Sequence, residues 1–208
     1  LVAQNISPNI NDLLSQFYIE ISKYYTKVPN QNTKKALRLS KEIDSIISVE
    51  GNLDIKSTAL YNNAKGSLYY QNNQNPTKYL KQADSLNNIL KEPIVEITVY
   101  SSTDLGEYYF KRKEYVKAKK TYSKIVNINN IPQKFNQYKS DALDKVFFIE
   151  RIQLNTQTDS LQVAQTAKKL IDFKKKINDT LNISYGNALD FIEKESDAEK
   201  VFLAISKT

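Results

Sequence analysis

Apolar residues recur along this chain at alternating spacings of four and three. Such spacings place side chains on one face of a helix, and a small residue at the first position lets two helices approach closely. The pattern therefore predicts paired helices rather than strands. Four segments carry the spacing, and in the second of them the large and small residues are exchanged: Ala36-x3-Ser40-x2-Ile43, Tyr79-x3-Ala83-x2-Leu86, Ala118-x3-Tyr122-x2-Ile125 and Ala198-x3-Phe202-x2-Ile205.

The same pattern, with the positions of Pro and Asn, sets the helix boundaries. Asn75 is a capping residue before Pro76, which suits a first helical position because no N–H is needed there. Connections rich in Asn, such as 71–75 and 127–130, can supply the left-handed backbone that glycine usually supplies. The predicted helices span 11–27, 33–49, 54–72, 76–91, 94–112, 115–128, 133–154, 159–177, 181–194 and 197–206.

Three of the four glycines share one 40-residue phase. Gly66 and Gly106 are 40 residues apart, and Gly186 follows 80 residues later. Each is followed, three positions on, by a large apolar or aromatic residue. A period of this length indicates a repeat built from one helical hairpin per unit.

The third repeat resembles the tetratricopeptide repeat (TPR). Leu105, Gly106 and Tyr109, followed by Ala118 and Tyr122, match the family pattern L-G-x2-Y…A-x3-F. Ser102 stands where the family has Trp, Asn130 where it has Pro, and the period exceeds the family's ~34 residues. The resemblance implies an all-α fold, a right-handed α-solenoid of about five TPR-like hairpins, in one domain spanning 1–208.

Composition argues against catalysis. The chain has no Cys and no His, so it lacks a thiolate nucleophile, the usual neutral-pH base and the commonest transition-metal ligands. It contains no phosphate-binding glycine loop and no nucleophile-elbow motif. The acidic group Glu193, Glu195, Asp197 and Glu199 is better interpreted as a helix–turn–helix junction. We expect no enzymatic activity, no metal site and no cofactor.

The basic excess is interpreted as a solvated surface. The net charge is +7, but only Arg38, Arg112 and Arg151 are arginine, the residue favoured for reading bases or clamping phosphate. Nucleic acid is therefore not the expected partner, although an acidic partner stays open. The basic residues form two clusters: Lys111, Arg112, Lys113, Lys117, Lys119, Lys120 and Lys124; and Lys168, Lys169, Lys174, Lys175 and Lys176.

The resemblance also selects a candidate binding surface. In tetratricopeptide arrays the first helix of each hairpin lines the concave groove. Glu107 would repel a peptide carboxylate, and the groove positions suit an apolar or aromatic contact with a protein or peptide. Tyr70, Tyr100 and Phe110 are the expected anchors. The predicted protein-binding residues are Asn63, Ser67, Tyr70, Tyr100, Thr103, Glu107 and Phe110.

The most specific expectation concerns cellular context. The pattern resembles the periplasmic sensor or scaffold segment of bacterial membrane-tethered transcription regulators or sensor kinases, and the opening Leu1-Val2-Ala3-Gln4 is compatible with the end of a signal sequence. Membrane attachment would come through flanking segments. A cytoplasmic regulator binding nucleic acid or a signalling peptide through its Lys-rich helices is one alternative, and an envelope assembly scaffold is another. The apolar C-terminal hairpin would pack on a further segment or form a homodimer.

Overall fold

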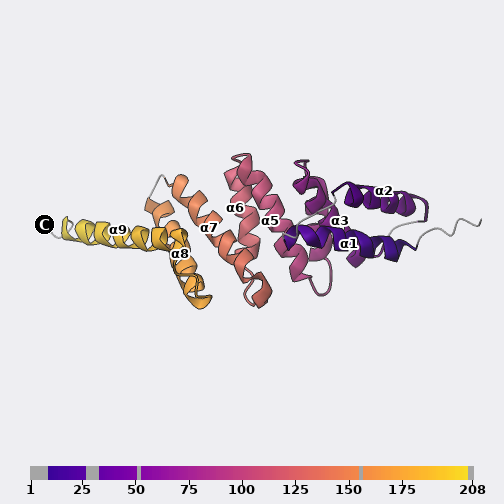
Figure 1. Cartoon of the computed structure of the whole chain (residues 1–208). Coiled ribbons are helices and arrows are strands. Elements are labelled where there is room, and N and C mark those ends of the chain that lie inside the picture. Colours follow the sequence, from indigo (N-terminus) through magenta and orange to yellow (C-terminus); the bar gives the residue numbers. More distant parts are fainter. Residues whose placement is uncertain (1–8, 27–32, 51–52, 155–156, 206–208) are drawn as a thin grey trace, which may run out of the picture. The chain divides into compact units, whose positions relative to one another are not determined.

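The computed structural model describes residues 9–26, 33–50, 53–154 and 157–205. This part of the chain contains helices and connections but no strand, which confirms the all-α prediction. The elements, shown in Figure 1, are α1 (Ile10–Tyr25), α2 (Thr33–Glu50), α3 (Ile55–Gln71), α4 (Thr77–Asn88), α5 (Val95–Lys111), α6 (Tyr115–Val126), the 3-10 turn η1 (Gln133–Phe135), α7 (Asn136–Ile152), α8 (Gln157–Lys176) and α9 (Ile183–Ile205).

The chain divides into two compact units, Leu1–Tyr108 and Tyr109–Thr208. In the first unit α1 packs on α2 and α3 packs on α4, while α1 and α2 also contact α3. Phe17, Leu39 and Leu68 are fully buried where these helices meet. The predicted face of α2 is buried as well, because Ala36 and Ile43 are inaccessible to solvent. Hydrophobic burial of this kind is the main term that holds paired helices together.

Backbone geometry at the ends of α3 and α5 repeats after 40 residues. Asn73 and Lys113 both adopt left-handed φ angles, 57° and 59°. At each end the N–H of the following residue donates to a carbonyl five residues earlier: Gln74 to Tyr69 at 2.8 Å, and Glu114 to Tyr109 at 3.0 Å. Both ends are therefore Schellman motifs. The prediction that Asn supplies a left-handed position in 71–75 is confirmed at Asn73. The same prediction for 127–130 is wrong, because none of these four residues has a positive φ.

In the second unit successive helices pack on one another, α6 on α7, α7 on α8 and α8 on α9. Ala118, Tyr122 and Ile125 are buried, so the predicted face of α6 is confirmed. Leu143 of α7 and Leu170 of α8 lie in a core that α9 completes. The second unit thus has its own apolar core, to which each of its three longest helices contributes.

The predicted fifth hairpin is wrong. Where the sequence pattern placed a turn between 194 and 197, α9 continues without interruption, as Figure 1 shows. No Gly or Pro follows Gly186 in the chain, and Asp190 pairs with Lys194 at 2.8 Å, an i,i+4 arrangement that supports a helix. A Cβ at Gly186 would meet nothing within 4 Å, so this glycine is not at a helix contact. The side chains of Ala198, Phe202 and Ile205 lie outside the described residues.

Within the described residues, no helix is both long and apolar enough to span a membrane.

Candidate binding site

A pocket of about 330 Å³ lies between α1, α3 and α5 in the first unit. These are the helices that the sequence pattern placed first in each hairpin. The pocket size lies at the lower end of the range that small-ligand sites occupy. Its lining residues are Tyr18, Ile21, Ser22, Tyr25, Thr26, Leu60, Asn63, Ala64, Glu96, Ile97 and Tyr100.

One side of the pocket is a stacked pair of tyrosines. The rings of Tyr25 and Tyr100 have centroids 4.1 Å apart and planes inclined by 23°. The Tyr25 hydroxyl contacts Ser67 Oγ and donates to Asp104 Oδ2 at 3.1 Å. Ser67 and Asp104 are both buried. Because contacts from α3 and α5 fix its hydroxyl, the ring of Tyr25 is held in place before any ligand arrives.

Asn63 supplies an unusual polar group to this pocket. Its side chain is 7% exposed, and its amide oxygen Oδ1 has no hydrogen-bond partner. A buried polar atom of this kind costs about 1–3 kcal/mol when it is left unpaired. Most native proteins satisfy such groups with protein, water or ligand. Asn63 is therefore the polar group of this pocket most in need of a partner.

Tyr18 lines the pocket from the part of α1 that lies two turns before Tyr25. Burial, with a smaller contribution from the negative charge of Asp54, raises the pKa of Tyr18 to about 12. The phenol therefore stays protonated throughout the physiological pH range. Glu96, in the first turn of α5, is the charged side chain among the lining residues, and none of the described lining residues is Lys or Arg.

The structure brings part of the predicted surface together. Asn63 and Tyr100 line the pocket, and Ser67 contacts the pocket residue Tyr25. Tyr70, Thr103 and Glu107 are half-buried and lie outside its lining. The Thr103 hydroxyl donates to the Val99 carbonyl within its own helix, at 2.8 Å.

Sequence reasoning missed the contribution of α1. Tyr18, Ser22, Tyr25 and Thr26 all line the pocket, but α1 has no phase glycine to mark its register. The 40-residue period could have indicated the register of α1, since a step of 40 residues back from Gly66 falls on Thr26.

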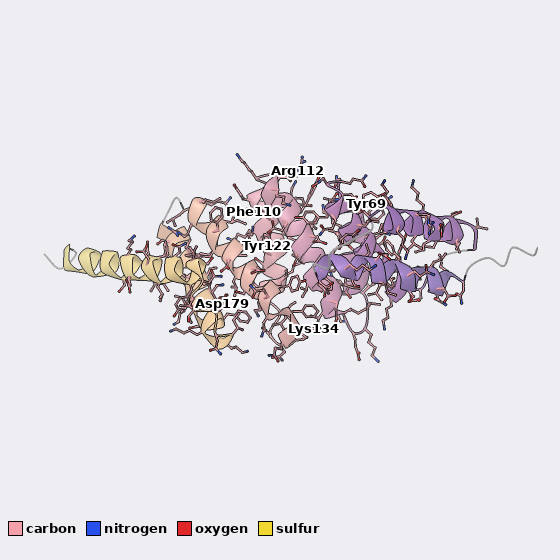
Figure 2. The ribbon with its side chains drawn as sticks, in the orientation of Figure 1. Tyr69, Phe110, Arg112, Tyr122, Lys134 and Asp179 are labelled. Atoms are coloured by element: carbon pink, nitrogen blue, oxygen red, sulfur yellow. The ribbon has the colours of Figure 1, made fainter. Side chains whose placement is uncertain are left out.

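Phe110 belongs to the second unit and packs within it. Its ring centroid lies 5.7 Å from those of Tyr115 and Phe148, and Lys145 Nζ lies 4.1 Å from it. The ring, labelled in Figure 2, is half-buried among these side chains. This predicted anchor is thus engaged in aromatic and cation–π packing inside its own unit.

The basic clusters are less uniform than their sequence indicated. Lys117, Lys120 and Lys124 are exposed as predicted, whereas Lys119 pairs with the buried Glu150 at 2.8 Å. Lys174 was placed on a solvated surface, and this was wrong, because its side chain is fully buried.

Partners from several segments explain the burial of Lys174. Its Nζ lies 2.8 Å from Ser140 Oγ, 3.1 Å from Asp144 Oδ2 and 3.0 Å from Asp179 Oδ2. Asp179, labelled in Figure 2, lies in the connection between α8 and α9. The ammonium group therefore ties this connection to α7, a structural role rather than a surface one.

A second hollow, of about 600 Å³, lies in the second unit between α6, α7 and α8. Lys139, Lys169 and Lys176 line it together with one carboxylate, Asp172. Burial lowers the pKa of Lys139, and the nearby charge of Lys176 lowers it further. Lys139 Nζ donates to the Ile128 carbonyl at 2.6 Å. Its remaining lining residues are Val126, Asn127, Asn129, Leu143 and Phe173.

Comparison with known proteins finds no matching family model, no matching curated protein and no matching solved structure. Within the described residues, no group of three or more acidic side chains is placed to hold a metal ion. The function must therefore be argued from the two hollows themselves.

Proposed function

We propose that this chain is a non-catalytic protein- or peptide-binding module whose pocket between α1, α3 and α5 receives one large side chain of its partner. The observation that carries the proposal is the stacked Tyr25–Tyr100 pair beside a buried, unpartnered Asn63 amide oxygen. Tyrosines contribute strongly to protein interfaces because they bury a large area at a low cost in side-chain entropy.

The geometry favours a side chain over a whole small molecule. A volume of about 330 Å³ is near the lower limit for small-ligand pockets. The pocket also opens beside Ser22 and Thr26, which are exposed, so the rest of a partner segment has room outside. Since Tyr25 is already fixed by Ser67 and Asp104, little ordering of the pocket is required on binding.

We extend the proposal to the architecture and its setting. Two features repeat after 40 residues: a glycine, at Gly66 and Gly106, and a left-handed backbone position, at Asn73 and Lys113. This repetition supports a tetratricopeptide-like solenoid of stacked hairpins. On this proposal α1, α3 and α5 belong to the concave wall. The resemblance noted in the sequence supports a periplasmic sensor or scaffold segment of a membrane-tethered regulator.

A pocket-blocking variant tests the proposal. Random peptides displayed on phage are selected on the full chain, and the enriched peptides are titrated calorimetrically. Ser22→Trp places a bulky ring at the pocket, whereas Ser15→Trp places the same ring at an exposed site on the same helix. We expect at least about tenfold weaker binding for Ser22→Trp alone. Equal affinities for both variants would contradict the proposal.

A second candidate function is favoured by the hollow in the second unit. Three lysines share it with a single carboxylate, and Lys139 is already partly desolvated beside Lys176. An acidic peptide segment would relieve this repulsion. Titration of the two variants Lys139→Gln and Lys168→Gln with a glutamate-rich peptide tests this second function. Lys168→Gln is the control, because Lys168 is exposed on α8 and lies outside the hollow. Loss of affinity confined to Lys139→Gln is expected.

A further inference from the structure

We infer that the hollow between α6, α7 and α8 is a binding site for a phosphate monoester that carries an apolar or aromatic body. The inference rests on the second function proposed above, the capture of an anionic group at this hollow. It adds the kind of anion, and it follows from the charges and the apolar residues of the lining.

Lys139 of α7 is a half-buried ammonium group that pairs with no carboxylate of the described residues. Its Nζ donates a hydrogen bond to the Ile128 carbonyl and lies 5.5 Å from the centroid of the Phe173 ring. An ammonium group has three N–H donors, so donors remain for a ligand. Because burying a charge without a counter-charge is costly, Lys139 favours an anion in the hollow.

Lys176, at the end of α8, supplies a second positive charge near Lys139. Burial is the larger cause that lowers the pKa of Lys139, and the charge of Lys176 lowers it further. An anion bound by both ammonium groups would replace their repulsion with attraction. The third lysine, Lys169, lies three residues before Asp172 on the same helix, so these two charges largely offset each other. The charge left for a ligand to match is therefore that of Lys139 and Lys176.

A phosphate monoester matches this pair of charges. At neutral pH it carries a charge of about −1.5 to −2 and three strong acceptor oxygens on one group. A carboxylate carries a single charge, so it would match only one of the two lysines. Lysine binds phosphate as a point charge, without the planar geometry that arginine imposes. Asn127 and Asn129, which also line the hollow, have side-chain N–H donors for further oxygens.

The rest of the lining favours an organic body on the phosphate. The hollow, of about 600 Å³, is within the size range of small-ligand sites and exceeds the space that a phosphoryl group alone occupies. Val126, Leu143 and Phe173 supply its apolar surface. An aromatic ring packed against Phe173 would add to the affinity. The ligand class is therefore an apolar or aromatic phosphate monoester rather than free phosphate.

The test uses three small probes on the full chain: phenyl phosphate, phenyl sulfate and inorganic phosphate. Phenyl sulfate has nearly the same shape as phenyl phosphate but a single charge, and inorganic phosphate lacks the ring. Each is titrated by NMR at about 0.15 M salt, where long-range attraction is screened. We expect saturable shifts of the Asn127 and Asn129 signals with phenyl phosphate, and at least about fivefold weaker binding of the other two probes.

Two adjacent lysines provide the matched variants. Lys176→Gln should weaken phenyl phosphate at least about fivefold, whereas Lys175→Gln removes the same charge from an exposed position outside the hollow and should change the affinity less than about twofold. No saturable binding of phenyl phosphate, equal binding of all three probes, or equal effects of the two variants would overturn the inference. The second function fails separately, when the glutamate-rich peptide binds Lys139→Gln as tightly as wild type.

Discussion

Gly66 of α3 lies directly against Leu80 of α4. A Cβ added to Gly66 would lie 2.5 Å from Leu80 Cγ and 3.1 Å from the Leu80 backbone nitrogen. Leu80 is fully buried and so has no solvent-exposed position to which it could move. The two helices therefore approach at a distance that only glycine permits at position 66.

Gly66→Ala should destabilise the protein by about 1–3 kcal/mol, the cost of overpacking a close helix contact. The effect opposes helix propensity, which favours alanine by up to about 1 kcal/mol. Gly186→Ala is the matched control, because a Cβ there meets nothing within 4 Å and should be neutral or stabilising. Urea unfolding followed by circular dichroism measures both; a loss of stability in the control but not at position 66 would contradict this interpretation.

Lys113→Gly should stabilise the protein by about 0.5–1 kcal/mol. Lys113 is exposed and holds a φ of 59°, which strains a residue with a Cβ, whereas glycine adopts it freely. Asn73→Gly, at the corresponding position 40 residues earlier, should change stability less because Asn tolerates this conformation. Thermal unfolding of the two variants provides the comparison. A decrease in melting temperature for Lys113→Gly would contradict the interpretation that Lys113 is strained by its left-handed φ.

Local signals predicted most of the helices. The alternating spacing identified the buried faces of α2 and α6, and the 71–75 connection was identified through its Asn residues. α9 was predicted incorrectly because the acidic group around Glu195 was interpreted as a turn. Residues such as Glu and Lys favour a helix when no Gly or Pro interrupts them, and this preference prevailed.

The sequence pattern could not predict contacts between residues that are far apart in the chain. Lys174 stands in a run of lysines, but its partners Ser140 and Asp144 come from α7, so a local view assigns it to solvent. The candidate site shows the same limit. The 40-residue register located Asn63 and Tyr100, whereas Tyr25 became part of the site through stacking across two helices.

Glu20→Gln should remove an acid-sensitive part of the stability. Hydrogen bonds from Lys23 and Lys35, both at 2.9 Å, lower the pKa of Glu20 in the folded state. The stabilisation is therefore present above the ordinary Glu pKa of about 4.3 and is lost as the pH falls through the lower, folded-state pKa. The difference in unfolding free energy between wild type and variant should narrow below about pH 4. Glu42→Gln, whose pair with Arg38 is exposed, is the control.

Oligonucleotides should bind only weakly. Lys117, Lys120 and Lys124 are exposed, but Lys119 is paired and Lys174 is buried, so the two clusters present less charge than the sequence indicates. At near-physiological salt we expect non-specific dissociation constants of about 10⁻⁴–10⁻⁶ M. Filter binding with single- and double-stranded DNA measures this. Submicromolar affinity that is abolished by changing the three exposed lysines to Glu would contradict the prediction.

Lys174→Met should destabilise the second unit by about 3–5 kcal/mol, the usual cost of removing one partner from a buried ion pair. Methionine keeps most of the packing of the stem but leaves Asp144 and Asp179 without the ammonium group that lies 3.1 and 3.0 Å from them. Lys175→Met tests the neighbouring exposed position and should stay within about 0.5 kcal/mol of wild type. Adding Asp144→Asn to Lys174→Met should recover part of the loss, because it removes one of the two uncompensated carboxylates. Urea unfolding of the four proteins decides the matter: equal, small effects at 174 and 175 would mean that Lys174 reaches solvent and that its contacts with α7 are not what anchors the connection to α9.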